Sequence, residues 1–121
     1  MNPKNKQDRK IIFDKFNGHC AYCGCELQLE KFQVDHFEAQ YWAIAEGGQP
    51  DNSYENLMPA CAECNRYKSD WTIEVIRTWL EKSKKQLVKT QNLRILNRIG
   101  GFTISDEPIK FYYEKHKAKT L

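Results

Sequence analysis

The sequence contains no run of about 18 consecutive apolar residues, the length that a transmembrane helix needs. Residues 1–16 also lack the apolar stretch of a secretory signal. There is no internal repeat and no low-complexity segment. We therefore expect an intracellular, cytoplasmic protein without a membrane partner.

A length of 121 residues is typical of one domain. The composition, with 40% hydrophobic and 29% charged residues, permits a packed core. A chain of this size nevertheless buries only about two-thirds of its unfolded surface. We expect a single domain over residues 1–121, in which an additional cross-link would add stability.

Charge is distributed unevenly along the chain, although the net charge is only +3. Residues 1–16 carry five basic and two acidic side chains, residues 17–76 carry three and ten, and residues 77–121 carry eleven and four. A polyanion would thus meet basic ends on either side of an acidic middle. Such a middle suits a nucleic-acid binder if it recruits cations of its own.

The local patterns predict a core over about residues 18–71 between two flanking segments. Apolar spacing predicts a helix over about residues 8–16, which ends at Asn17-Gly18. Alternation between Leu27 and Val34 favours extended chain, and Leu57-Met58 forms a second brief apolar element.

The C-terminal extension, about residues 72–121, is expected to contain helices and a strand. Thr72 can cap a helix with an apolar stripe, and Gly100-Gly101 ends the helical region. The pattern leaves open whether one helix continues through Leu87 or two helices are present. Alternation after Pro108 predicts a terminal strand.

The five cysteines include two Cys-x-x-Cys pairs, Cys20/Cys23 and Cys61/Cys64. Two such pairs can place four sulfurs around one tetrahedral ion, and we expect structural zinc. A redox-active thiol pair is the competing interpretation, but no βαβ pattern accompanies either pair. Cys25 has no partner in this scheme and is expected to be a bystander, with a role as a substitute ligand as the alternative. A zinc ion bound by both pairs would then close the 37-residue segment 24–60 into a loop.

Asp35 and His36 are adjacent near the end of the expected extended run, and Asn65 directly follows Cys64. A carboxylate, an imidazole and an amide are suited to holding a hard cation and moving a proton. As an isolated pair, Asp35 and His36 could equally cap a turn and fill space. The surrounding motifs favour the functional interpretation.

The order of these motifs resembles the HNH endonuclease family, the His-Me finger nucleases. The segments that carry the resemblance, within about residues 18–71, are Cys20-Ala21-Tyr22-Cys23, Val34-Asp35-His36-Phe37, Glu55-Asn56-Leu57-Met58-Pro59 and Cys61-Ala62-Glu63-Cys64-Asn65-Arg66-Tyr67-Lys68. The resemblance implies an α+β fold, a small zinc-stapled ββα-metal (treble-clef-like) HNH domain with flanking helices.

The resemblance also implies roles for individual residues. His36 would be the general base, since a largely neutral imidazole can accept a proton from water near pH 7. Asp35 and Asn65 would hold one catalytic Mg²⁺ or Mn²⁺, and Asn56 would order the loop that orients His36. Asn65 stands where other members have histidine, which makes this chain an HNN variant. The products would carry 5′-phosphate and 3′-hydroxyl ends.

DNA is the expected partner, and basic side chains are the candidate contacts with its phosphates. Two lie beside Asn65 and four in the C-terminal extension: Arg66, Lys68, Lys82, Lys84, Lys85 and Lys89. No separate DNA-reading module is visible, so a partner protein or a homodimer is the expected source of sequence specificity. The alternative function is a zinc-dependent DNA-binding module without catalysis.

Overall fold

The computed structural model describes all residues from 1 to 121. The chain forms two compact units. The first unit comprises Met1–Thr72 together with Lys110–Leu121, and the second comprises Ile73–Ile109. None of the helices combines the length and the apolar character that crossing a membrane requires.

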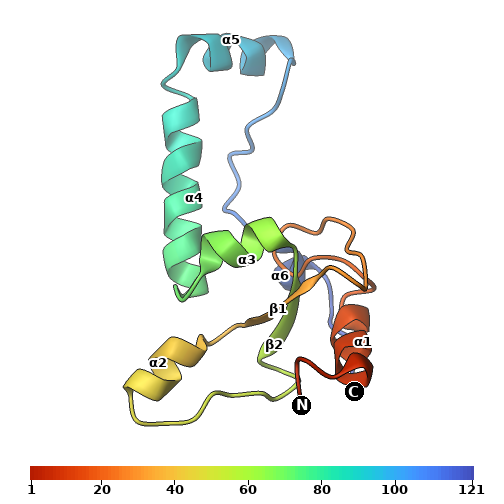
Figure 1. Cartoon of the computed structure of the whole chain (residues 1–121). Coiled ribbons are helices and arrows are strands. Elements are labelled where there is room, and N and C mark those ends of the chain that lie inside the picture. Colours follow the sequence, from red (N-terminus) through yellow and green to blue (C-terminus); the bar gives the residue numbers. More distant parts are fainter. The chain divides into compact units, whose positions relative to one another are not determined.

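The centre of the first unit is a two-stranded antiparallel sheet, β1 (Gln33–His36) and β2 (Leu57–Ala60). His36 pairs with Leu57, and Gln33 pairs with Ala60. Figure 1 shows the strands side by side, with α3 (Ala62–Lys68) following β2. This arrangement confirms the expected ββα order. The extended chain predicted from Leu27 onwards is confined to the four residues of β1.

Helix α1 (Lys6–Asp14) confirms the predicted N-terminal helix with slightly shifted bounds. Asn5 caps it, because its side chain accepts hydrogen bonds from the Gln7 and Asp8 N–H groups. The buried face of α1 joins a small apolar core formed by Ile12, Phe32 and Leu57. This core anchors β2, and therefore the chain on either side of it.

Two short helices in the first unit differ from expectation. Helix α2 (Gln40–Ala45) was not predicted, and it has no buried residue. The terminal strand predicted after Pro108 is wrong: the chain forms the short helix α6 (Tyr112–Lys115) instead. This segment has no neighbouring strand to pair with, because the sheet consists of β1 and β2 alone. The Tyr112 and Tyr113 N–H groups donate instead to the carbonyls of Tyr22 and Ala21.

The second unit contains α4 (Ile73–Leu87), α5 (Gln91–Ile99) and a returning segment. The helical region therefore breaks after Leu87, and Gly100 ends α5 in a left-handed conformation. The returning segment is held by α4, because Arg77 donates to the Ile109 carbonyl at 2.6 Å. In the same place, Glu81 accepts from the Ile109 N–H at 2.7 Å.

Candidate functional site

The first cysteine knuckle is a tight turn from Cys20 to Cys25. The Gly24 N–H donates to the Cys20 carbonyl, and the Cys20 N–H donates to the Cys25 carbonyl, each at 2.9 Å. Gly24 has a left-handed φ of +79°, and a Cβ there would lie 2.5 Å from the ring of Tyr112. Glycine is therefore required at this point of the turn.

The second knuckle lies at the start of α3. Cys61 is the N-cap residue, and its sulfur accepts a hydrogen bond from the Cys64 N–H at 3.3 Å. The Sγ atoms of Cys23 and Cys61 lie 3.9 Å apart, so the two knuckles meet.

All five cysteines take part in one sulfur cluster without a disulfide. The Sγ atoms of four of them lie within 4.8 Å of one another: Cys20, Cys23, Cys25 and Cys61. The thiol of Cys64 is hydrogen-bonded to Cys20, which lowers the pKa of Cys20 to about 4. A cluster of sulfurs at these separations fits a zinc ion. The turn returns the sulfur of Cys25 to the cluster, which favours the alternative that Cys25 is a substitute ligand over the bystander role.

Next to β1 and α3 there is a cavity of about 380 Å³. Three of the predicted site residues line it together, Asp35 and His36 from β1 and Asn65 from α3. Arg66 also lines the cavity, as do two residues that sequence reasoning did not select, Gln40 and Asp70. A proton acceptor and oxygen ligands thus share one concave surface.

Asp35 is buried, and its Oδ2 atom accepts a hydrogen bond from the Tyr22 hydroxyl. The same oxygen lies 3.1 Å from the Lys68 ammonium. Burial raises the pKa of Asp35, whereas the charge of Lys68 and the hydrogen bond from Tyr22 act to lower it. Burial, and then the charge of Asp35, raises the pKa of Tyr22 well above its usual range, so its hydroxyl remains a donor.

His36 is oriented by side-chain amides. Its Nε2 atom lies 2.7 Å from Oδ1 of Asn52 and 3.3 Å from Nε2 of Gln40. An amide oxygen can only accept and an amide nitrogen can only donate, so the Asn52 contact requires a proton on Nε2, whereas the Gln40 contact requires a lone pair there. The ring nitrogen that is not protonated carries the lone pair that can accept a proton.

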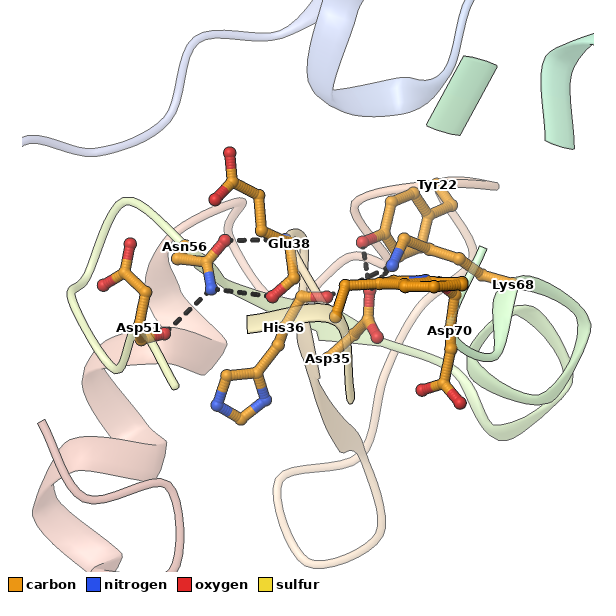
Figure 2. Close-up of polar contacts among 9 residues, drawn as sticks. Tyr22, Asp35, His36, Glu38, Asp51, Asn56, Lys68 and Asp70 are labelled. Carbon is orange, nitrogen blue, oxygen red and sulfur yellow. Dashed lines mark hydrogen bonds and ion pairs between the residues drawn. The ribbon is translucent and has the colours of Figure 1, made fainter. Parts of the chain in front are cut away.

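Asn56 does not line the cavity but holds the chain around it. Its Oδ1 accepts from the Glu38 N–H at 2.7 Å, and its Nδ2 donates to the Asp51 carbonyl at 2.8 Å. Figure 2 shows Asn56 bridging these two segments. Glu38 lies two residues after His36, and Asp51 directly precedes Asn52. Asn56 therefore joins the end of β1 to the loop that contacts the imidazole.

The structure separates the basic residues proposed to contact nucleic acid. Arg66 is exposed beside the cavity. Lys68 is only 2% exposed and its ammonium is directed at Asp35, so we correct its assignment from phosphate contact to an internal ion pair. In the second unit, Lys82, Lys85 and Lys89 are exposed. The ammonium of Lys84 already has a partner, because it donates to the Glu107 carbonyl at 2.5 Å.

Several residues of the site escaped sequence reasoning. Tyr22 lies inside a motif that was recognised for its cysteines, and Asn52 lies in a segment whose composition indicates only a loop. Gln40 and Asp70 follow β1 and α3 at distances that no short motif fixes. The hydrogen bond between Tyr22 and Asp35 depends on the fold, and the sequence carries no direct signal for this contact.

Comparison with known proteins finds a family match for the segment that carries this site. The family model of HNH endonucleases matches residues 20–70, the segment that contains both knuckles and every residue lining the cavity. A protein of Bacillus subtilis (strain 168), named "SPbeta prophage-derived putative HNH endonuclease YoqL", is 30% identical over 91 residues. These residues cover 74% of this chain and 38% of that protein. No solved structure matches the chain significantly. Residues 20–70 of the chain therefore match the HNH endonuclease family.

Proposed function

We propose that this chain hydrolyses phosphodiester bonds of DNA, with His36 as the general base and one divalent cation held by Asp35 and Asn65. The match to the HNH family supports a nuclease activity. The observation that carries the finer proposal is the single cavity lined by these three side chains. The 5′-phosphate and 3′-hydroxyl products follow from the same proposal.

In the proposed reaction, His36 accepts a proton from the water that attacks the phosphorus atom. An N–H at Nε2 that donates to Asn52 would leave Nδ1 as the accepting nitrogen. The bond between phosphorus and the 3′ oxygen then breaks. Asn56 acts indirectly, because it fixes the loop that carries Asn52. Arg66 contributes a positive charge at the rim of the cavity for a backbone phosphate.

The oxygen donors of the cavity fit Mg²⁺ or Mn²⁺, ions that prefer carboxylate and amide oxygens. Asp35 and Asn65 would hold the ion, and no thiol lines this cavity to favour a softer metal. A divalent cation bound there would stabilise the negative charge that develops on the phosphate and on the departing oxygen. The sulfur cluster would bind zinc separately and join β2 and α3 to the first knuckle.

Nicking of supercoiled plasmid by the purified chain, with and without Mg²⁺ or Mn²⁺, tests the proposal. We expect metal-dependent nicking and about a 100-fold or greater loss of rate in His36→Ala, the range for removal of a general base. His116→Ala is the matched control, because His116 does not line the cavity. Binding to a labelled duplex should survive in His36→Ala.

The same experiment separates the alternatives. Binding of DNA without cleavage by the wild-type chain would favour the zinc-dependent binding module. Full cleavage by His36→Ala would overturn the role of the base. Cleavage that requires oxidised or reduced thiols instead of a divalent cation would favour redox chemistry at the cysteines.

A further inference from the structure

We propose that Tyr22 and Lys68 are positioning residues that hold Asp35 with one carboxylate oxygen, Oδ1, presented to the cavity for the divalent cation. This inference rests on the proposed function, because it assumes that Asp35 is a ligand of the cation. Tyr22 and Lys68 do not line the cavity themselves. Their proposed role is to fix the orientation of the Asp35 carboxylate toward the cation.

Both donors act on the same atom of Asp35. The Tyr22 hydroxyl and the Lys68 ammonium each contact Oδ2. Figure 2 shows the other carboxylate oxygen turned away from both donors. Because Tyr22, Asp35 and Lys68 are each at most 6% exposed, water cannot readily replace either donor. The carboxylate is therefore fixed in rotation, with Oδ2 occupied and Oδ1 available.

Lys68 also links the two elements that carry the proposed site residues, β1 and α3. Its ammonium donates to the backbone carbonyl of His36 at 3.1 Å, in addition to its ion pair with Asp35. Lys68 lies on α3, three residues after Asn65, so the two project from neighbouring positions of one helix. One buried charge thus sets α3 against β1 at the point where both contribute to the cavity.

Tyr22 is itself held by the C-terminal segment of the first unit. The Tyr112 N–H donates to the Tyr22 carbonyl at 3.0 Å. The rings of Phe111 and Tyr113 each meet the Tyr22 ring edge-on, with centroids 6.3 Å away. The hydroxyl therefore reaches Asp35 from a ring that cannot turn aside, which is what a positioning residue requires.

Removing the Tyr22 hydroxyl should weaken cation binding without abolishing it. Loss of a group that orients a metal ligand typically lowers metal affinity 10- to 100-fold. Tyr22→Phe is the informative variant, because it preserves the ring and its packing. Tyr41→Phe is the matched control, since Tyr41 is 59% exposed and does not line the cavity.

Binding of Mn²⁺ to the zinc-loaded full chain, followed by electron paramagnetic resonance, provides a readout that does not depend on cleavage. We expect the dissociation constant to rise about 10-fold or more in Tyr22→Phe and to stay unchanged in Tyr41→Phe. Asp35→Asn identifies the site, because it should lose the same bound Mn²⁺. Wild-type affinity in Tyr22→Phe, with binding lost in Asp35→Asn, would overturn the positioning role alone.

The metal dependence of plasmid nicking adds a second test. In Tyr22→Phe, the half-saturating Mn²⁺ concentration should rise by the same factor, and saturating Mn²⁺ should restore the rate. A loss that no concentration of Mn²⁺ restores would show a general structural role and overturn the inference. Unchanged Mn²⁺ binding in Asp35→Asn would instead overturn the cation site of the proposed function, and this inference with it.

Discussion

Lys15 shows how one buried side chain can organise a loop next to the site. It is only 4% exposed and follows directly after α1. Its ammonium donates to the carbonyls of Tyr54, Glu55 and Leu57 at 2.7, 3.3 and 3.0 Å. These residues surround Asn56, so Lys15 ties the end of α1 to the chain that Asn56 connects to β1. A buried charge is tolerated here because three acceptors converge on it.

We therefore expect Lys15→Met to lower the free energy of unfolding by about 2–4 kcal/mol, because it leaves buried carbonyls without a donor. Urea unfolding measures this change. Lys10→Met is the matched control, since Lys10 makes an exposed ion pair with Asp14 and should cost less than about 1 kcal/mol. Equal losses in the two variants would contradict the role of the buried contacts.

At the scale of single residues, sequence reasoning selected three side chains that the fold brings to one cavity and missed the side chains that contact them. Asp35 and His36 are recognisable because they lie between the two cysteine pairs, and Asn65 because it directly follows Cys64. Lys68 follows Arg66 closely, and a basic helix is usually solvated, so its burial was not predictable. The partner that makes burial favourable, Asp35, is distant in sequence and is brought near only by the fold.

At the scale of elements, the two knuckles offer five sulfurs to an ion that takes four. Cys25 lies within the cluster, and Cys64 contacts it through Cys20. We expect Cys25→Ser and Cys64→Ser each to retain one zinc ion, because the remaining sulfur can complete the tetrahedron. The double variant should lose zinc and unfold at lower temperature. Native mass spectrometry and thermal unfolding give the two readouts.

Cobalt substitution provides the control for this prediction, since the intensity of thiolate-to-metal absorption follows the number of bound sulfurs. Four thiolates should be seen in the wild-type chain and in both single variants. Complete loss of metal in Cys64→Ser, together with no change in Cys25→Ser, would restore the original interpretation of Cys25 as a bystander.

Elements with their own periodic signal were predictable, and elements defined by docking were not. The apolar stripe of α4 and the glycines after α5 marked these helices in the sequence. Helix α6 has only four residues, and the alternation of Ile109, Phe111 and Tyr113 before and into it equally fits a strand. Its backbone instead bonds to the first knuckle, a partner that alternation cannot reveal.

At the scale of the whole molecule, the charge profile gains a structural meaning. The second unit, Ile73–Ile109, carries seven basic and four acidic side chains. Within α4, Lys82 and Lys85 are exposed, whereas Lys84 is engaged by Glu81 at 3.8 Å and by the Glu107 carbonyl. Free lysines on a basic unit are suited to phosphate contacts, which act by releasing counterions.

We therefore expect Lys82→Gln and Lys85→Gln each to reduce the salt dependence of DNA binding by about one unit in the slope of log affinity against log salt. Lys84→Gln, the matched control on the same helix, should change the slope less because its ammonium already has partners within the unit. Fluorescence anisotropy with a labelled duplex, over a series of salt concentrations, measures the slope. The measurement uses His36→Ala as the background, so that cleavage does not interfere.

The three substitutions change the same charge on one helix, so a general loss of positive charge would lower all three slopes equally. That outcome would contradict a specific surface on α4. Unchanged slopes in all three variants would place the phosphate contacts elsewhere, with Arg66 at the cavity as the next candidate. A smaller slope only in Lys82→Gln and Lys85→Gln would identify the second unit as the part of the chain that attracts DNA, and the first as the part that cuts it.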